Sequence, residues 1–256
     1  MKFGLRLLST DNETYIWEIP RLFENGGFDY VELRVIPDTL DKLKFWKILK
    51  ENHNVPFVLH APFSSLGVNL SEESKFEHNK EMYEQTKTYM RELEAEYMVV
   101  HGGVEGDIKE TVRQLNLINP PNMLIENKPF NPPGNSEIRC RGAVIDEIKF
   151  IREEHPCGFC LDIAHAICTA NHIGKEPYEY LAEFQKLKPH AYHISDNPID
   201  SDYDGHNNLG KGGYDFEKIL KIIDTDKNIT LETPKNSNFS LDYFAGEVEF
   251  LKSKLG

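Results

Sequence analysis

Short apolar runs rich in β-branched and aromatic residues alternate along the whole chain with longer stretches of helical periodicity. Eight such runs are present: Phe3–Leu7, Tyr30–Val35, Phe57–His60, Tyr97–His101, Met123–Glu126, Gly158–Asp162, Ala191–Ile194 and Ile229–Glu232. Each is followed by a stretch of helical character, as is typical of βα units in a parallel sheet. The pattern predicts an α/β fold, a (β/α)8 TIM barrel with eight parallel strands.

Residues that favour helix N-termini precede several of the helical stretches. Asp38 precedes the helix expected after the second strand, Ser71 the long polar helix that runs towards Glu94, and Ser240 the last helix. We find no Ser/Gly linker, low-complexity tract, repeat or shift of composition along the chain. Because 256 residues is an ordinary length for one barrel, we expect residues 1–256 to form a single domain.

Composition and the start of the chain bear on the cellular location of the protein and on the state of its cysteines. Its start lacks the basic and apolar segments of a signal peptide, and no stretch approaches the ~18 apolar residues of a transmembrane helix. We therefore expect a cytoplasmic protein with no membrane partner. The pair Cys157 and Cys160 has no second CxxC to complete a four-thiolate zinc site, and it leads into a strand. We interpret the cysteines as buried, reduced thiols.

Residues that commonly bind metals end six of the predicted strands: His60, His101, Glu126, Asp162, His193 and Glu232. The C-terminal strand ends of such a barrel form its active face, so these side chains should converge. Any one of them alone is more simply a hydrogen-bonded polar strand end. Six together indicate a metal site, because a shared ion satisfies several buried carboxylates at once.

Three further candidate ligands follow from local spacing. His165 lies three residues after Asp162, at the start of the next expected helix, and Asp204 and His206 lie in the long loop after His193. Asp-Gly is also a common turn sequence, so a solvated turn is the alternative interpretation of that pair. Five other histidines are interpreted as structural or surface residues: His53, His78, His155, His172 and His190.

The motifs that carry these residues resemble those of the xylose-isomerase-like TIM barrels, the superfamily that includes endonuclease IV and many sugar isomerases and epimerases. The most specific are HAPF from His60, VHGG around His101, IEN around Glu126, CLDIAHA from Cys160, HISD from His193, DGHNNLGKG from Asp204 and LETP ending in Pro234. In this combination and order they are specific for the superfamily and extend over nearly the whole chain.

A resemblance to endonuclease IV, of the apurinic/apyrimidinic (AP) endonuclease family 2, implies up to three Zn2+ ions and abasic or damaged DNA as substrate. The implied ligand sets are His60, His101 and Glu126; Glu126, Asp162, His193 and Glu232; and His165, Asp204 and His206. Clustered divalent ions activate a bridging hydroxide and stabilise the oxygens of a phosphodiester. The resemblance thus implies a phosphoester hydrolase.

A resemblance to the isomerase branch of the superfamily implies one metal ion in place of three. There a single ion, Mn2+ or Mg2+, is held by Glu126, Asp162, His193 and Glu232, and the two glutamates move a proton between adjacent carbons of a small sugar. His165 then contacts the substrate. Across the two branches we take Glu126, Glu232 and His165 as the candidate catalytic residues.

Candidate substrate contacts are less specific than the ligands. Phe63 could stack on a base, and Lys128 and Lys211 lie in segments expected at the active face. Glu32 and its neighbour Arg34 could either contact substrate or form a salt bridge inside the barrel, and both interpretations stay open. Two further cations are interpreted as ordinary surface charge, namely Arg139 and Arg141.

Two features weaken the DNA hypothesis. The formal net charge of −13 opposes attraction to a polyanion, although three divalent ions would offset about half of it. The segment Ile36–Asp38 is too short to wedge into a duplex, and Val31-Glu32-Leu33 is more typical of the isomerases and epimerases. We take the hydrolase as the first hypothesis, the isomerase or epimerase as the second, and a metal-binding barrel without catalysis as the third.

Overall fold

A computed structural model describes residues 1–11, 13–15, 17–132 and 134–255. Eight strands form a closed barrel in chain order, and every neighbouring pair is parallel. They are β1 (Lys2–Leu8), β2 (Tyr30–Arg34), β3 (Phe57–His60), β4 (Met98–His101), β5 (Met123–Glu126), β6 (Gly158–Asp162), β7 (Ala191–Ile194) and β8 (Asn228–Leu231). The predicted (β/α)8 barrel is confirmed, and the strand bounds differ from the prediction by one residue at most at either end.

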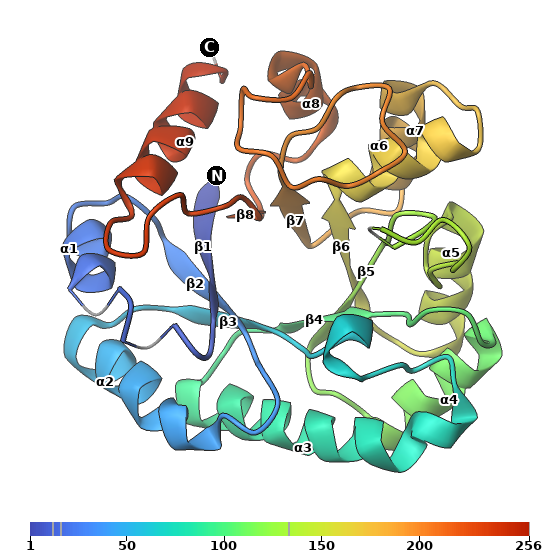
Figure 1. The fold of residues 1–256 in the computed structure, drawn as a ribbon, viewed down its shortest axis with the longest axis horizontal. Coiled ribbons are helices and arrows are strands. Elements are labelled where there is room, and N and C mark those ends of the chain that lie inside the picture. The colour runs from blue at the N-terminus through green and yellow to red at the C-terminus, as the bar shows by residue number, and fades with distance from the viewer. Residues whose placement is uncertain (12, 16, 133, 256) are drawn as a thin grey trace.

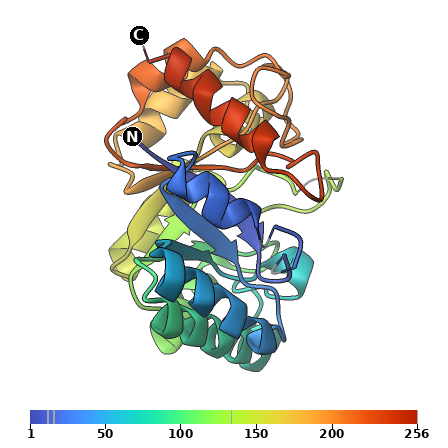
Figure 2. The same ribbon diagram turned by 90° about the vertical axis from the view of Figure 1, so that its left-hand side faces the viewer.

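Helices surround the strands as an outer ring (Figure 1). They are α1 (Glu18–Glu24), α2 (Leu43–His53), α3 (Phe76–Leu93), α4 (Ile108–Ile118), α5 (Ile145–Glu154), α6 (Ile163–His172), α7 (Pro177–Gln185), α8 (Phe216–Ile222) and α9 (Asp242–Ser253). Two helices, α6 and α7, follow β6. The last helix lies beside the first (Figures 1 and 2), where Arg21 and Asp242 form an ion pair at 2.9 Å.

Two of the expected helix starts are wrong because the polar residues serve other contacts. The hydroxyl of Ser71 donates to the carbonyl of Val104, and α3 begins only after a 3-10 turn, Glu73–Lys75. Asp38 has a left-handed backbone (φ 61°) and hydrogen bonds to Gln85, so α2 also begins after a 3-10 turn. At the last helix, Ser240 accepts a hydrogen bond from the backbone of Asp242, as expected of a residue at a helix start.

The barrel interior consists of layers set by the two-residue period of the strands. A small apolar cluster fills the layers nearer the N-terminal ends of the strands: Tyr30, Val58, Tyr97, Val99, Leu124, Cys160 and Ala191. Five of these residues stand two positions before a candidate metal ligand on the same strand. The same alternation that builds the core therefore points the ligands into the barrel, above an apolar floor.

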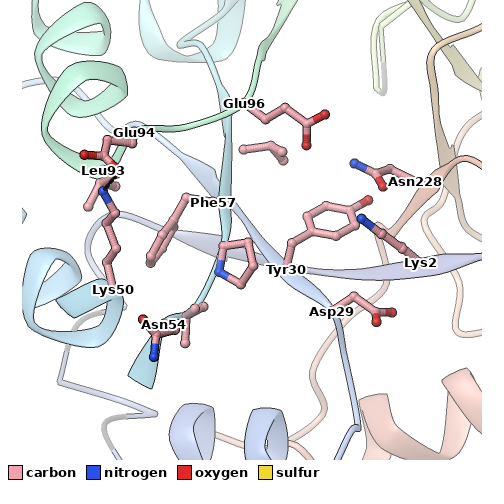
Figure 3. A pocket seen from close by; sticks show the side chains of 13 residues that line it. Lys2, Asp29, Tyr30, Lys50, Asn54, Phe57, Leu93, Glu94, Glu96 and Asn228 are labelled. Carbon is pink, nitrogen blue, oxygen red and sulfur yellow. Dashed lines mark ion pairs between the residues drawn. The ribbon is translucent and has the colours of Figure 1, made fainter. Parts of the chain in front are cut away.

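A cavity of about 330 Å³ lies at the opposite mouth of the barrel (Figure 3). It is formed by the N-terminal strand ends, with Tyr30, Lys2 and Asn228 on one side and the ion pair of Lys50 and Glu94 on the other. Among the described residues that line it, none is a candidate metal ligand. Active sites of this fold lie at the C-terminal face and not at this mouth of the barrel.

None of the described helices has both the length and the apolar character needed to cross a bilayer.

Candidate metal centre

All nine candidate ligands converge at the C-terminal mouth of the barrel. Strand register places His101 beside Glu126 and Asp162 beside His193, and Glu232 directly follows β8. Eight of the nine are buried, and His206 is partly exposed. Parallel strand ends meet in one place, which is why residues far apart in sequence share this site.

The first trio consists of His60, His101 and Glu126. Nε2 of His60 and Nε2 of His101 lie 3.3 and 2.9 Å from the same carboxylate oxygen, Oε2 of Glu126. Nδ1 of His60 donates to the carbonyl of Ala61 at 2.8 Å, which leaves the lone pair of Nε2 facing that oxygen. Burial, with Lys128 nearby, holds the pKa of His101 well below its usual range, so this ring is neutral. Facing lone pairs of this kind suit a cation between them.

The other outer trio, His165, Asp204 and His206, repeats the arrangement. Nε2 of His165 and Nε2 of His206 lie 3.1 and 2.9 Å from Oδ2 of Asp204. Their Nδ1 atoms donate to the backbone carbonyls of Asn127 and Glu232. Both rings are thereby oriented by the backbone, and both direct Nε2 at one carboxylate, as metal-binding histidines do.

Between the two trios lie Asp162, His193 and Glu232, together with Glu126. Each of these four residues has one buried atom without a hydrogen-bond partner among the described residues: Glu126 Oε1, Asp162 Oδ2, His193 Nδ1 and Glu232 Oε1. Buried polar atoms without a hydrogen bond are costly, so each of the four is expected to find a further partner. A divalent ion with N and O ligands fits this set.

The four atoms do not form one compact group. The donor atoms of Glu126, Asp162 and His165 lie within 4.8 Å of one another, and so do those of Glu32, His193 and Glu232. Nδ1 of His193 is 3.6 Å from Glu126 and 3.4 Å from Glu232. The residues of the implied second ligand set are therefore divided between two neighbouring groups, whereas the residues of the first set, and those of the third, lie together.

Burial and neighbouring charges shift the pKa values of the residues in the centre in opposite directions. Although burial works against its charged form, the Lys128 ammonium and Nδ1 of His165, which lies 3.1 Å from Oε1, hold the pKa of Glu126 well below its usual range. Burial raises the pKa of Asp162 to about 6. Burial also opposes a charge on His165, but Asp162 and the other carboxylates around it outweigh this effect and raise its pKa to about 10. These carboxylates therefore attract positive charge strongly.

Glu32 orients the candidate ligand His193 from inside the barrel. It is fully buried and accepts hydrogen bonds from Nε2 of His193 at 3.0 Å and from the hydroxyl of Thr230 at 2.8 Å. The first bond leaves Nδ1 of His193 to face the carboxylates above, the usual role of a carboxylate behind a metal-binding histidine. Glu32 is not among the described residues that line the cavity beside the centre, so the structure shows its contact with His193, and a contact with substrate stays a prediction.

A cavity of about 290 Å³ opens beside the centre, and the residues in and around it include Phe63, Lys128 and Arg34. The Phe63 ring lies 4.5 Å from the ring of His101, and the guanidinium of Arg34 lies 4.7 Å from the same phenyl ring. Arg34 also forms a salt bridge with Glu232 at 3.6 Å. It therefore forms the salt bridge inside the barrel and also lies where it could contact a substrate, the two roles that the sequence left open.

Other candidate cations lie elsewhere. Lys211 is exposed, and it is not among the described residues that line this cavity. Arg139 and Arg141 both pair with Glu147, in line with their interpretation as residues outside the site. Other histidines outside the centre contact residues away from it, such as His53 with Glu24 and His155 with Asn116.

Two residues that contact the site, Arg6 and Glu247, were not predicted from the sequence. Arg6 lies on β1 and pairs with Glu232 at a distance of 3.2 Å. Its place in the sequence could have indicated this contact, because Arg6 lies two residues after Gly4 and therefore faces the barrel interior on the same side of the strand. Glu247 is buried on α9, where its carboxylate accepts from the backbone of Leu209 and from the hydroxyl of Thr233. Its signal was a carboxylate on the otherwise apolar face of a helix.

Comparison with known sequences identifies the family of this chain. The profile of the family described as xylose isomerase-like TIM barrel matches residues 21–254. The chain belongs to this family. A curated relative named "Probable endonuclease 4" from Clostridium beijerinckii is 28% identical over 239 residues, which cover 84% of this chain and 83% of the relative.

Solved structures of the family share the fold. A D-tagatose 3-epimerase-like protein superposes with a TM-score of 0.76 at 20% identity, covering 100% of this chain and 97% of its own. Endonuclease IV from Thermus thermophilus superposes with a TM-score of 0.73 at 20% identity, covering 100% and 99%. At this identity the likeness shows the family barrel alone, and both kinds of enzyme occur on it.

Proposed function

We propose that this member of the family is a metal-dependent phosphoester hydrolase resembling endonuclease IV, with abasic DNA as its substrate. The observation that supports this most strongly is the pair of complete trios, each a carboxylate oxygen faced by two Nε2 atoms, on either side of the four unpaired ligand atoms. A single-ion enzyme has no need of the two outer trios. The relative named "Probable endonuclease 4" points to the same activity.

The residues fit three ion positions. His60, His101 and Glu126 would hold one ion, His165, Asp204 and His206 another, and Glu126, Asp162, His193 and Glu232 the one between them. When bound, such a cluster supplies a hydroxide near neutral pH and stabilises charge on the oxygens of a phosphodiester. We assign catalytic roles to Glu126, Glu232 and His165, because these side chains connect the trios to the central residues: Nδ1 of His165 lies 3.1 Å from Glu126, and Glu232 lies 3.4 Å from Nδ1 of His193.

Residues around the cavity would bind the rest of the substrate. Phe63 offers an aromatic face to a base or to the abasic sugar, and Lys128 and Arg34 offer positive charge to a phosphate. Lys211 would contact the DNA backbone further from the centre, since its side chain is exposed. With an overall charge of −13, the protein depends on such local cations to hold DNA.

Metal content and strand nicking test the proposal together. Elemental analysis of the purified protein should find close to three zinc ions per chain, and the protein should nick a duplex with one abasic site but not the same duplex without it. A chelator should abolish nicking, and added Zn2+ should restore it. Three bound ions without any abasic nicking would direct the search to other phosphoesters and would refute the substrate assignment.

A divalent-metal-dependent sugar isomerase or epimerase is the second candidate. It is favoured by the four atoms without a hydrogen bond, because one ion drawing the two neighbouring groups together would give each atom a partner, and by the two carboxylates that face His193 and could exchange a proton with a sugar carbon. One bound Mn2+ or Mg2+ per chain, with ketose-dependent uptake of deuterium from heavy water, would support this function and exclude the hydrolase.

A further inference from the structure

Lys128 places an ammonium group among the candidate ligands. Its Nζ atom lies 3.5 Å from Oε1 of Glu126, 3.4 Å from Nε2 of His101 and 3.5 Å from Nε2 of His165. Those two histidines belong to different trios, so the ammonium bridges the space between them. Only 15% of the side chain is exposed.

An ammonium and a divalent ion cannot share these donors without a large repulsion. Lysine carries a full charge and three donors but no lone pair, so it neutralises Glu126 without coordinating anything. Like charges held a few ångströms apart in a buried site repel strongly. Metal binding at the trios therefore requires the Lys128 ammonium to move away.

The neighbouring cavity gives the side chain a place to go. Lys128 already lies at its wall, with Nζ 5.9 Å from the centre of the Phe63 ring, and four methylene groups let the ammonium swing while the backbone stays in place. Arg34 lies over the same ring and is likewise paired with a candidate ligand, Glu232. Metal binding would release both cations from their carboxylates at the same wall.

We propose that Lys128 is an exchangeable counter-ion of the metal centre: it neutralises the ligands before metal binds, and is displaced on metal binding into the cavity, where it holds a phosphate oxygen of the substrate together with Arg34. This inference rests on the proposed function, since it takes a multinuclear centre and a phosphate-containing substrate as given. Substrate affinity is then coupled to metal loading by one side chain.

Removal of the charge should move two affinities in opposite directions. In Lys128→Met, zinc no longer competes with an ammonium, so its affinity for the metal-free protein should rise about tenfold, the effect of removing ~1.4 kcal/mol of repulsion. Inorganic phosphate should bind the zinc-loaded variant at least about fivefold more weakly than the zinc-loaded parent, because a charged hydrogen bond is lost. A residue with only a structural role would weaken both or neither.

Calorimetric titration of the full-length chain measures both affinities. Zn2+ alone is titrated into metal-free parent, Lys128→Met and Lys128→Arg, and phosphate is then titrated into the loaded proteins. Lys128→Arg keeps the charge and should bind zinc no more tightly than the parent. Lys175→Met is the matched control, because this lysine is exposed and pairs with Glu183 away from the centre, and it should leave both affinities unchanged.

The outcomes separate this inference from the proposed function. Unchanged or weaker zinc binding by Lys128→Met, in protein whose circular dichroism matches the parent, would refute the counter-ion role. Unchanged phosphate affinity would refute the displaced contact. Neither titration measures hydrolysis, so a protein that shows both opposite shifts but never nicks abasic DNA would support the inference while refuting the AP-endonuclease assignment.

Discussion

His206 is the most exposed of the candidate ligands, with 30% of its side chain accessible. His206→Ala should lower the zinc content by one ion per chain and reduce abasic nicking at least about a hundredfold, because Asp204 and His165 alone cannot complete that ion's coordination. Elemental analysis and a nicking assay measure both effects. His172→Ala is the control: this histidine is also partly exposed but faces Asp202, and its loss should change neither. Unaltered metal content in His206→Ala would exclude it as a ligand.

His165 predicts proton release on metal binding. Its pKa of about 10 in the metal-free protein, held up by Asp162 and the other carboxylates against burial and the charge of Lys128, means that both ring nitrogens carry a proton at pH 7.5. The proton on Nε2 must leave before that nitrogen can bind metal. Zinc affinity should therefore rise with pH from about 7 towards 10. Calorimetry at pH 7.5 in two buffers of different ionisation enthalpy should show net proton release. Heats that do not depend on the buffer would contradict this protonation state.

At the residue scale, the sequence located the candidate ligands but not their hydrogen-bond partners. His101 and Glu126 could be selected because each ends an apolar run, a position where a polar group demands an explanation. Glu32 was also noticed, yet its contact with His193 spans 161 positions and depends on barrel closure. Which atoms of a residue face one another is decided by side-chain packing across strands, and no local pattern records it.

At the scale of elements, α9 supports the loop that carries Asp204 and His206. Glu247 accepts a hydrogen bond from the backbone of Leu209 at 2.8 Å and another from the hydroxyl of Thr233 at 2.6 Å, so it links the loops after β7 and β8. A helix on the outside of the barrel thus helps to position ligands at its mouth.

Glu247→Ala should therefore affect both stability and metal binding. Leaving buried donors without a partner costs about 2 to 4 kcal/mol of unfolding free energy, and the loosened loop should weaken the outermost ion more than the others. Urea denaturation and zinc titration measure the two effects. Glu249→Ala lies on the same helix but is exposed and paired with Lys252, so it should change the unfolding free energy by less than about 0.5 kcal/mol. Equal effects of the two substitutions would argue against the link.

Strands were more predictable than helix starts. Apolar runs of four or five residues between polar segments define a buried strand almost completely, since both faces of a parallel strand are covered. The start of a helix depends on which groups satisfy its first N–H donors. Ser71 is a good capping residue by type, but the fold uses its hydroxyl to hold the loop at Val104.

At the scale of the whole molecule, metal should stabilise the fold. The centre gathers buried carboxylates in a protein that already carries a net charge of −13, and divalent ions relieve that repulsion and bind only the folded chain. Removal of metal with a chelator should lower the melting temperature by at least about 5 °C, and added Zn2+ should restore it. At a zinc concentration about a hundred times Kd, linkage alone contributes about 2.7 kcal/mol. An identical melting temperature with and without metal would contradict a bound cluster.

The amino-acid sequence by itself determined the barrel and the nine candidate ligands, because alternating strands and helices imply parallel strands, and the C-terminal ends of parallel strands meet at the active face. Only the tertiary structure decided how those ligands divide into two complete trios and a central group, that Lys128 lies among them, and that Glu32 and Glu247 support them. The reason is physical: periodicity is a property of neighbouring residues, whereas a metal centre is made of distances between atoms that only the closed barrel brings together.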